Sequence, residues 1–185
     1  MSASDRNWRA FAVGVGTNVG DRAAQVEMAV RLLGTDEAIR HLHVAPAITT
    51  DPVVPGGHAD EHPEYLNTAI IGETTRSPEV LMSRLLTVET TCGRRRRGTV
   101  DPRTLDLDLL VFEGASVRRD GLEVPHPRLS GRRFVLDPLV ALLNGLEPWD
   151  GASDSSPTPM SAERRLRAAV HGALKAAGVP DSELH

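Results

Sequence analysis

Within the stretch from Pro102 to Phe112, leucine alternates with aspartate over residues 105–109, and this pattern is the strongest constraint on how the chain can fold. A period of two predicts a β-strand, in which successive side chains point to opposite faces of a sheet. Asp106 and Asp108 would then share one face, with their Cα atoms roughly 6 to 7 Å apart, because a strand rises about 3.3 Å per residue. The leucines between them would pack against a core on the other face.

Two carboxylates this close can act together as ligands of a divalent cation. Mg²⁺ accepts one or two protein carboxylates and completes its coordination with water and substrate phosphate. A bound cation would also relieve the repulsion between the two like charges. The same alternation is typical of an amphipathic strand with a solvated acidic face, so the pattern alone leaves both interpretations open.

Arginines surround this stretch: Arg94 to Arg97 precede it, and Arg103 lies at its start. Guanidinium groups form bidentate pairs with phosphate oxygens, so a basic segment beside paired aspartates suits a metal-bound triphosphate. A solvated basic loop and a nucleic-acid contact are the competing interpretations. The net charge of −4 and the six scattered aromatic residues argue against a sheet that binds nucleic acid by base stacking.

A chain of 185 residues, 40% of them hydrophobic, can form one sizeable core. Cys92 is the only cysteine, which excludes an internal disulfide and is usual in the reducing cytosol. The sequence has no signal-peptide pattern at its start and no apolar run of about 18 residues. We therefore expect a cytoplasmic protein that binds neither a membrane nor nucleic acid.

The periodicities predict an element order of β-α-β-β-α-β. Strands are expected over 10–16, 39–50, 65–72 and 102–112, and helices over 21–34 and 77–93. Asp21 and Ser77 are typical N-caps of these helices. This order predicts an α+β fold, a ferredoxin-like antiparallel sheet with helices packed on it.

The C-terminal part predicts additions to that core. They are a hairpin over 113–121, an extended link over 122–127, a helix after Arg132, a linker over 151–159, a helix over 161–177 and a disordered tail.

Four further side chains are candidates for function. Glu89 lies near the end of a predicted helix, where the macrodipole disfavours a carboxylate, so it either binds a partner or is exposed; the arginines that follow favour a partner. His126 lies between two prolines, which restrict its backbone. Tyr65 and Asn67 share one face of a strand, where they could hold a flat heterocycle, although core packing is the alternative for Tyr65.

Six short motifs occur in order along the chain. They are Gly16-Thr17-Asn18, Tyr65-Leu66-Asn67, Glu89 with Gly93-Arg94-x-Arg96, Pro102-Arg103-Thr104-Leu105-Asp106-Leu107-Asp108, Val124-Pro125-His126-Pro127 and Arg132-x-Phe134. Together they resemble the 6-hydroxymethyl-7,8-dihydropterin pyrophosphokinases of folate biosynthesis. The resemblance covers about residues 10–145, and the fourth motif is highly specific.

The resemblance implies transfer of pyrophosphate from ATP to the hydroxymethyl group of the dihydropterin, with release of AMP. It implies that Asp106 and Asp108 bind two Mg²⁺ ions. The residues with implied catalytic roles are Arg94, Arg96, Arg103, Asp106 and Asp108. Those with implied ATP contacts are Glu89, Arg94, Arg96, Arg103, His126 and Arg132. Tyr65 and Phe134 would enclose the pterin ring, and Asn67 would bond its edge.

The resemblance also implies a domain organisation and partners. Residues 10–145 would form the catalytic domain, and residues 146–185 a linker, a helix and a tail. The expected partners are ATP and the dihydropterin, bound by a monomer. The alternative is an inactive relative that serves as a scaffold and binds pterin or nucleotide without releasing AMP. Val100 and Asp101 depart from the family pattern, in which tryptophan and glycine are frequent at these places.

Overall fold

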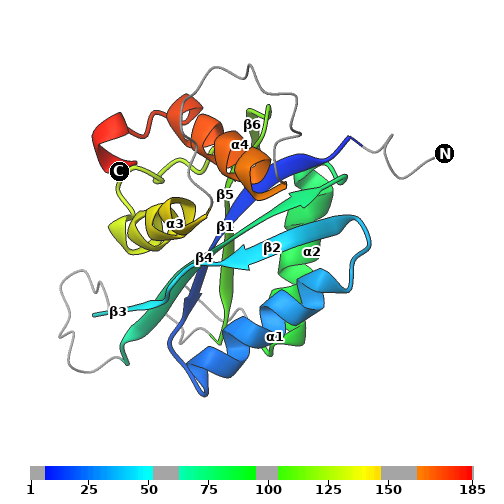
Figure 1. Cartoon of the computed structure of the whole chain (residues 1–185). Coiled ribbons are helices and arrows are strands. Elements are labelled where there is room, and N and C mark those ends of the chain that lie inside the picture. Colours follow the sequence, from blue (N-terminus) through cyan, green and yellow to red (C-terminus); the bar gives the residue numbers. More distant parts are fainter. Residues whose placement is uncertain (1–6, 52–62, 95–103, 147–161, 185) are drawn as a thin grey trace, which may run out of the picture.

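The computed structural model describes residues 7–51, 63–94, 104–146 and 162–184, which form an antiparallel sheet covered by helices (Figure 1). The strands of the main sheet are β1 (Arg9–Thr17), β2 (Ile39–Val44), β3 (Ile48–Thr50), β4 (Tyr65–Thr74) and β5 (Asp106–Phe112). Their order is β2-β4-β1-β5, with β3 also paired to β4, and every pairing is antiparallel.

The α-helices of the described residues are α1 (Arg22–Gly34), α2 (Pro78–Thr91), α3 (Arg133–Gly145) and α4 (Ala162–Ala176). A hairpin of β6 (Val117–Arg119) and β7 (Leu122–Val124) follows β5, and a short 3-10 helix, η3 (Asp181–Glu183), follows α4. Asp21 and Ser77 accept the N-cap hydrogen bonds of α1 and α2, as the sequence predicted.

The two central strands of the sheet, β1 and β4, are buried on both faces. Along β1, Phe11 and Val13 pack in the core formed with α1 and α2, whereas Ala10 and Ala12 pack in the core formed with α3 and α4. Figure 1 shows the two pairs of helices on opposite sides of the sheet. The predicted α+β, ferredoxin-like arrangement is therefore confirmed, and alternation along the central strand is its physical basis.

One predicted strand is interrupted. Residues 39–50 were expected to be continuous, but the structure divides them into β2 and β3 around Pro46, which has no N–H to donate to a ladder. The backbone stays beside β4 at the break, because the Ala45 N–H donates to the Ala69 carbonyl at 2.8 Å. Both pieces pair with β4, so the predicted order of the core is unchanged.

The prediction of a disordered tail is wrong for residues 178–184. Val179 and Leu184 are 3% and 4% exposed and belong to the same core cluster as Leu166 and Val170 of α4. These apolar side chains are too sparse for a periodic pattern, and they are buried in the core cluster that α3 and α4 help to form. The helix and tail thus complete the core on one face of the sheet.

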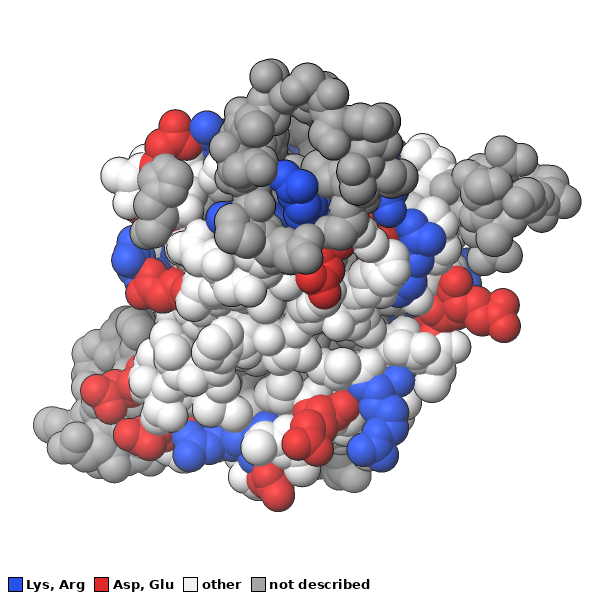
Figure 2. All heavy atoms as spheres, in the orientation of Figure 1, with Lys and Arg blue, Asp and Glu red and all other residues white. Residues whose placement is uncertain are grey.

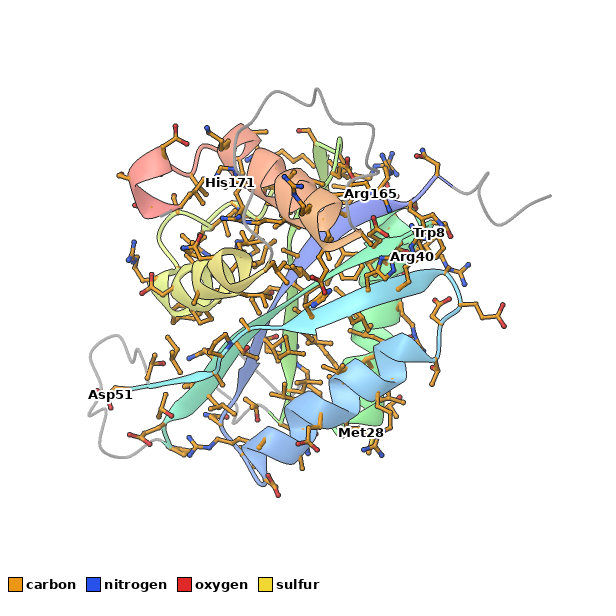
Figure 3. The ribbon with its side chains drawn as sticks, viewed as in Figure 1. Trp8, Met28, Arg40, Asp51, Arg165 and His171 are labelled. Carbon is orange, nitrogen blue, oxygen red and sulfur yellow. The ribbon has the colours of Figure 1, made fainter. Side chains whose placement is uncertain are left out.

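The end of the sheet where β1 begins is closed by a structural cluster. The Arg40 guanidinium lies 4.0 Å from the centroid of the Trp8 ring, and its Nε donates to buried Glu73 at 2.7 Å. Figure 3 shows Trp8 and Arg40 at this end, with Asp51, just after β3, at the other. The predicted site residues Asn67, Asp106 and Asp108 lie toward the Asp51 end.

The face shown in Figure 2 carries acidic and basic side chains interspersed among other residues. Within the described ranges, no helix has the length and apolar character that crossing a membrane requires.

Candidate active site

Asp106 and Asp108 lie on the face of the sheet against which α3 and α4 pack, and each forms an ion pair with an arginine. Arg94 Nη1 donates to Asp106 Oδ1, and Arg132 Nη1 donates to Asp108 Oδ2. The four side chains are between 16% and 32% exposed. Partial burial weakens solvent screening, so these pairs are stronger than ordinary surface ion pairs.

The end of α2 positions Arg94. Gly93 adopts a φ of +86°, the left-handed conformation that ends many helices. The Arg94 N–H donates to the Glu89 carbonyl and the Gly93 N–H to the Thr90 carbonyl, both at 3.0 Å. This is the Schellman pattern, and it brings Arg94 back beside Glu89.

Glu89 connects α2 to the acidic strand. Its side chain is buried, and Oε1 accepts hydrogen bonds from the Leu107 N–H, at 2.8 Å, and from Arg94 Nη1. These hydrogen bonds offset the unfavourable free energy of a buried carboxylate near the negative end of the helix dipole. The expected contact between Glu89 and the arginine segment is confirmed for Arg94, and Arg94 bridges Glu89 and Asp106.

We expect Gly93→Ala to lower the free energy of unfolding by about 1 to 2 kcal/mol, because an L-residue is strained in the left-handed conformation. The change should also displace Arg94 from Glu89 and Asp106. Urea unfolding measures the change in stability. Gly172→Ala is the matched control: Gly172 lies inside α4, no atom of the described residues beyond its chain neighbours and the helix backbone lies within 4 Å of its Cβ position, and alanine favours the helix there. Equal stability of the two variants would contradict the role of Gly93.

Two glycines of β1 lie between the aspartates of β5, Asp106 and Asp108, and the side chain of Asn67 on β4. Gly16 is paired with Asp106 on one side and Asn67 on the other, and Gly14 with Asp108 and Ala69. Neighbouring strands lie about 4.8 Å apart, so β4 and β5 are roughly 10 Å apart across β1. No β1 side chain fills this width at the two glycines.

Asn67 is 4% exposed, and its Nδ2 donates to Thr50 Oγ1 at 2.8 Å. Thr50 is paired with Tyr65, so the predicted pterin residues of β4 lie beside β3. Sequence reasoning missed Thr50. It belongs to no motif, and only the register between β3 and β4 brings it to Asn67.

Phe134, in the first turn of α3, is half-buried against the core beneath that helix. The Arg132 guanidinium lies 6.0 Å from the centroid of its ring. Arg132 thus lies between Phe134 and Asp108. Helix α3, which carries Phe134, contacts both β3 and β4. The structure brings Arg132, Asp108 and Phe134 together as one group, and Arg94, Glu89 and Asp106 as another.

A β-bulge positions His126. The register between β1 and β5 shifts by one residue at Leu110, and the Leu110 carbonyl accepts the His126 N–H at 2.8 Å. The Arg128 N–H donates to His126 Nδ1 at 3.2 Å, so in the neutral ring the proton lies on Nε2. Burial, reinforced by the positive charge of Arg132, lowers the pKa of His126 below its ordinary value of 6.5.

This lowered pKa predicts a pH dependence of stability. Between the folded and the ordinary pKa the unfolded chain binds more protons, so stability is lost as pH falls through 6.5 toward the folded value. We expect wild type to lose more unfolding free energy than His126→Asn between about pH 7.5 and pH 5, as measured by urea unfolding. Asparagine retains an acceptor for the Arg128 N–H but does not titrate. Identical losses in the two proteins would contradict the lowered pKa.

Some predicted positions lie outside the described residues. They are Arg96 and Arg103, together with Val100 and Asp101 at the departures from the family pattern.

Comparison with known proteins assigns the family. Residues 12–144, from β1 to α3, match the family described as 7,8-dihydro-6-hydroxymethylpterin-pyrophosphokinase (HPPK). The chain belongs to the HPPK family. The HPPK match thus contains every described residue of the two groups above, whereas α4 lies beyond it.

Curated relatives match between 70% and 77% of the chain. The 2-amino-4-hydroxy-6-hydroxymethyldihydropteridine pyrophosphokinase of Bacillus subtilis is 36% identical over 135 residues, 73% of this chain and 78% of that protein. The protein of the same name from Methylorubrum extorquens is 35% identical over 130 residues, 70% of this chain and 80% of that protein. The folic acid synthesis protein fol1 of Schizosaccharomyces pombe is 33% identical over 149 residues, 77% of this chain but only 20% of that longer protein.

Proposed function

We propose that the chain transfers pyrophosphate from ATP to 6-hydroxymethyl-7,8-dihydropterin and releases AMP, as a step of tetrahydrofolate synthesis. One observation carries the proposal. Asp106 and Asp108 lie across Gly14 and Gly16 of β1 from Asn67. Each of the two carboxylates is paired with an arginine. This arrangement offers carboxylates for metal, guanidinium groups for phosphate and an amide for a heterocycle on one face of the sheet.

The donor set fits Mg²⁺. Two carboxylates on neighbouring same-face positions supply the hard oxygen ligands that this ion takes from proteins. Within the described residues no group of three histidine, cysteine, aspartate or glutamate side chains gathers, as expected for an ion that also binds water and phosphate. We propose that Asp106 and Asp108 hold two Mg²⁺ ions, which when bound would neutralise charge on the triphosphate.

The arginines would exchange partners as substrate binds. In the structure the guanidinium groups of Arg94 and Arg132 neutralise the two aspartates. A triphosphate would attract those groups and leave the carboxylate oxygens to a cation. Arg96, Arg103 and His126, the last as a neutral donor, would add phosphate contacts, and Glu89 would hold Arg94 in place.

The other residues would orient the acceptor. Tyr65 and Phe134 would enclose the flat ring, and Asn67 would hydrogen-bond its edge. The hydroxymethyl oxygen attacks the β-phosphorus, the bond from that phosphorus to the bridging oxygen of AMP breaks, and the hydroxyl proton passes to solvent. Positioning and charge neutralisation would supply most of the catalysis.

A direct assay tests this function. Purified protein with ATP, Mg²⁺ and the hydroxymethyl dihydropterin should produce equal amounts of AMP and pyrophosphorylated pterin, which chromatography resolves. Absence of AMP at every Mg²⁺ concentration would refute it. Binding of pterin or nucleotide without AMP would support the inactive scaffold, which the named relatives do not favour.

The proposal also covers the cellular compartment and the oligomeric state. We propose a cytoplasmic monomer; the single cysteine is usual for a protein of the reducing cytosol.

A further inference from the structure

Two glycines of β1 differ in what surrounds them. A Cβ on Gly14 would lie 3.1 Å from Val135 Cγ1 and 3.4 Å from Leu110 Cδ2, so Gly14 allows α3 to approach the sheet closely. A Cβ on Gly16 would meet, among the described residues, only Asn67 Oδ1, at 3.4 Å. Packing of the described chain therefore explains the missing side chain at Gly14 but not at Gly16.

Glycine at position 16 lowers the stability of the fold, and packing among the described residues does not require it. Gly16 lies within the central strand, where glycine is less stable than alanine by roughly 0.5 to 1 kcal/mol because it loses more conformational freedom on folding. Its φ lies outside the left-handed region that favours glycine. A destabilising residue in ordinary extended backbone, with no described side chain filling the space above it, indicates a need for that space.

The neighbours of Gly16 indicate what uses the space. Asn67 and Asp106 are its two cross-strand partners, one on each side. If Asn67 holds the pterin ring and Asp106 holds metal, the atoms that join ring and reacting oxygen must cross this row of the sheet. Those atoms are the short hydroxymethyl arm of the acceptor.

We propose that Gly16 determines substrate specificity, because its missing side chain admits the hydroxymethyl arm between Asn67 and the acidic pair. This inference rests on the proposed function. The site then takes flat heterocycles with a short, unbranched primary alcohol. A side chain at position 16 would exclude the arm and leave the nucleotide side of the site intact.

The substitution Gly16→Ala separates this role from a structural one. We expect its melting temperature to equal or exceed that of wild type, and binding of Mg²⁺ with an unreactive ATP analogue to be unchanged. Its affinity for the hydroxymethyl dihydropterin should fall about 10- to 200-fold, the usual discrimination for one carbon in a tight pocket. The affinity for a dihydropterin that lacks the arm should fall much less. Calorimetry measures all three affinities.

Gly14→Ala is the matched control in the same strand. Because its Cβ would crowd Val135, we expect this variant to have a lower melting temperature. The inference is overturned if Gly16→Ala binds the substrate like wild type, loses equal affinity for pterins with and without the arm, or is destabilised like Gly14→Ala. Failure of wild type to release AMP would instead refute the proposed function.

Discussion

Asp108→Asn should lower the rate of AMP release by about 100- to 1,000-fold, the usual cost of removing one preorganised electrostatic group. Asparagine keeps the shape of the side chain but loses the charge that would hold a cation, and it leaves Arg132 without its carboxylate partner. Pterin affinity should change less than about twofold, since the proposed pterin residues lie on β4 and α3 and the loss falls on transition-state interactions. Single-turnover kinetics and pterin titration measure the two quantities.

Asp137→Asn is the matched control for this variant. Asp137 lies on the exposed surface of α3, where it pairs with Arg133 one turn away, so the same substitution should leave turnover unchanged. Normal activity of Asp108→Asn would contradict the proposed metal role. Loss of pterin binding in parallel with turnover would indicate a general disturbance of the site.

Arg132→Ala should change two properties in opposite directions. Turnover should fall by about 100-fold or more, because a phosphate contact is lost. Binding of Mn²⁺ alone, followed by electron paramagnetic resonance without nucleotide, should strengthen by about fivefold or more. In the structure Arg132 donates to Asp108, so a cation must compete with the guanidinium for that carboxylate.

The neighbouring residue provides the control. Arg133 is 61% exposed and contacts Asp137 and Glu183, so Arg133→Ala should leave both Mn²⁺ binding and turnover unchanged. Arg132→Lys should restore part of the turnover, because an ammonium retains the charge but not the bidentate geometry. Unchanged or weaker Mn²⁺ binding in Arg132→Ala would contradict the exchange of partners.

Local chemistry made parts of the fold predictable. Asp21 and Ser77 begin their helices because their side chains satisfy free N–H groups, a short-range interaction that a few residues reveal. Alternation along β4 correctly placed Asn67 and Ala69 on one face. The break at Pro46 was missed because loose alternation continues through it, although a proline is visible in the sequence.

The tail, residues 178–184, shows what local sequence patterns could not predict. Val179 and Leu184 are ordered only because α3 and α4 provide an apolar surface for them, and no local pattern encodes a surface built by distant segments. Thr50 was missed at the site for the same reason.

The sequence by itself determined the element order, the shared face of Asp106 and Asp108, and the family motifs, because each depends on residues that are close together along the chain. The tertiary structure decided which arginine meets which aspartate, that buried Glu89 accepts the Leu107 N–H, and that Gly16 separates Asn67 from Asp106. These relations depend on strand order and register. Packing across the sheet sets both, and they bring together residues that no local periodicity connects.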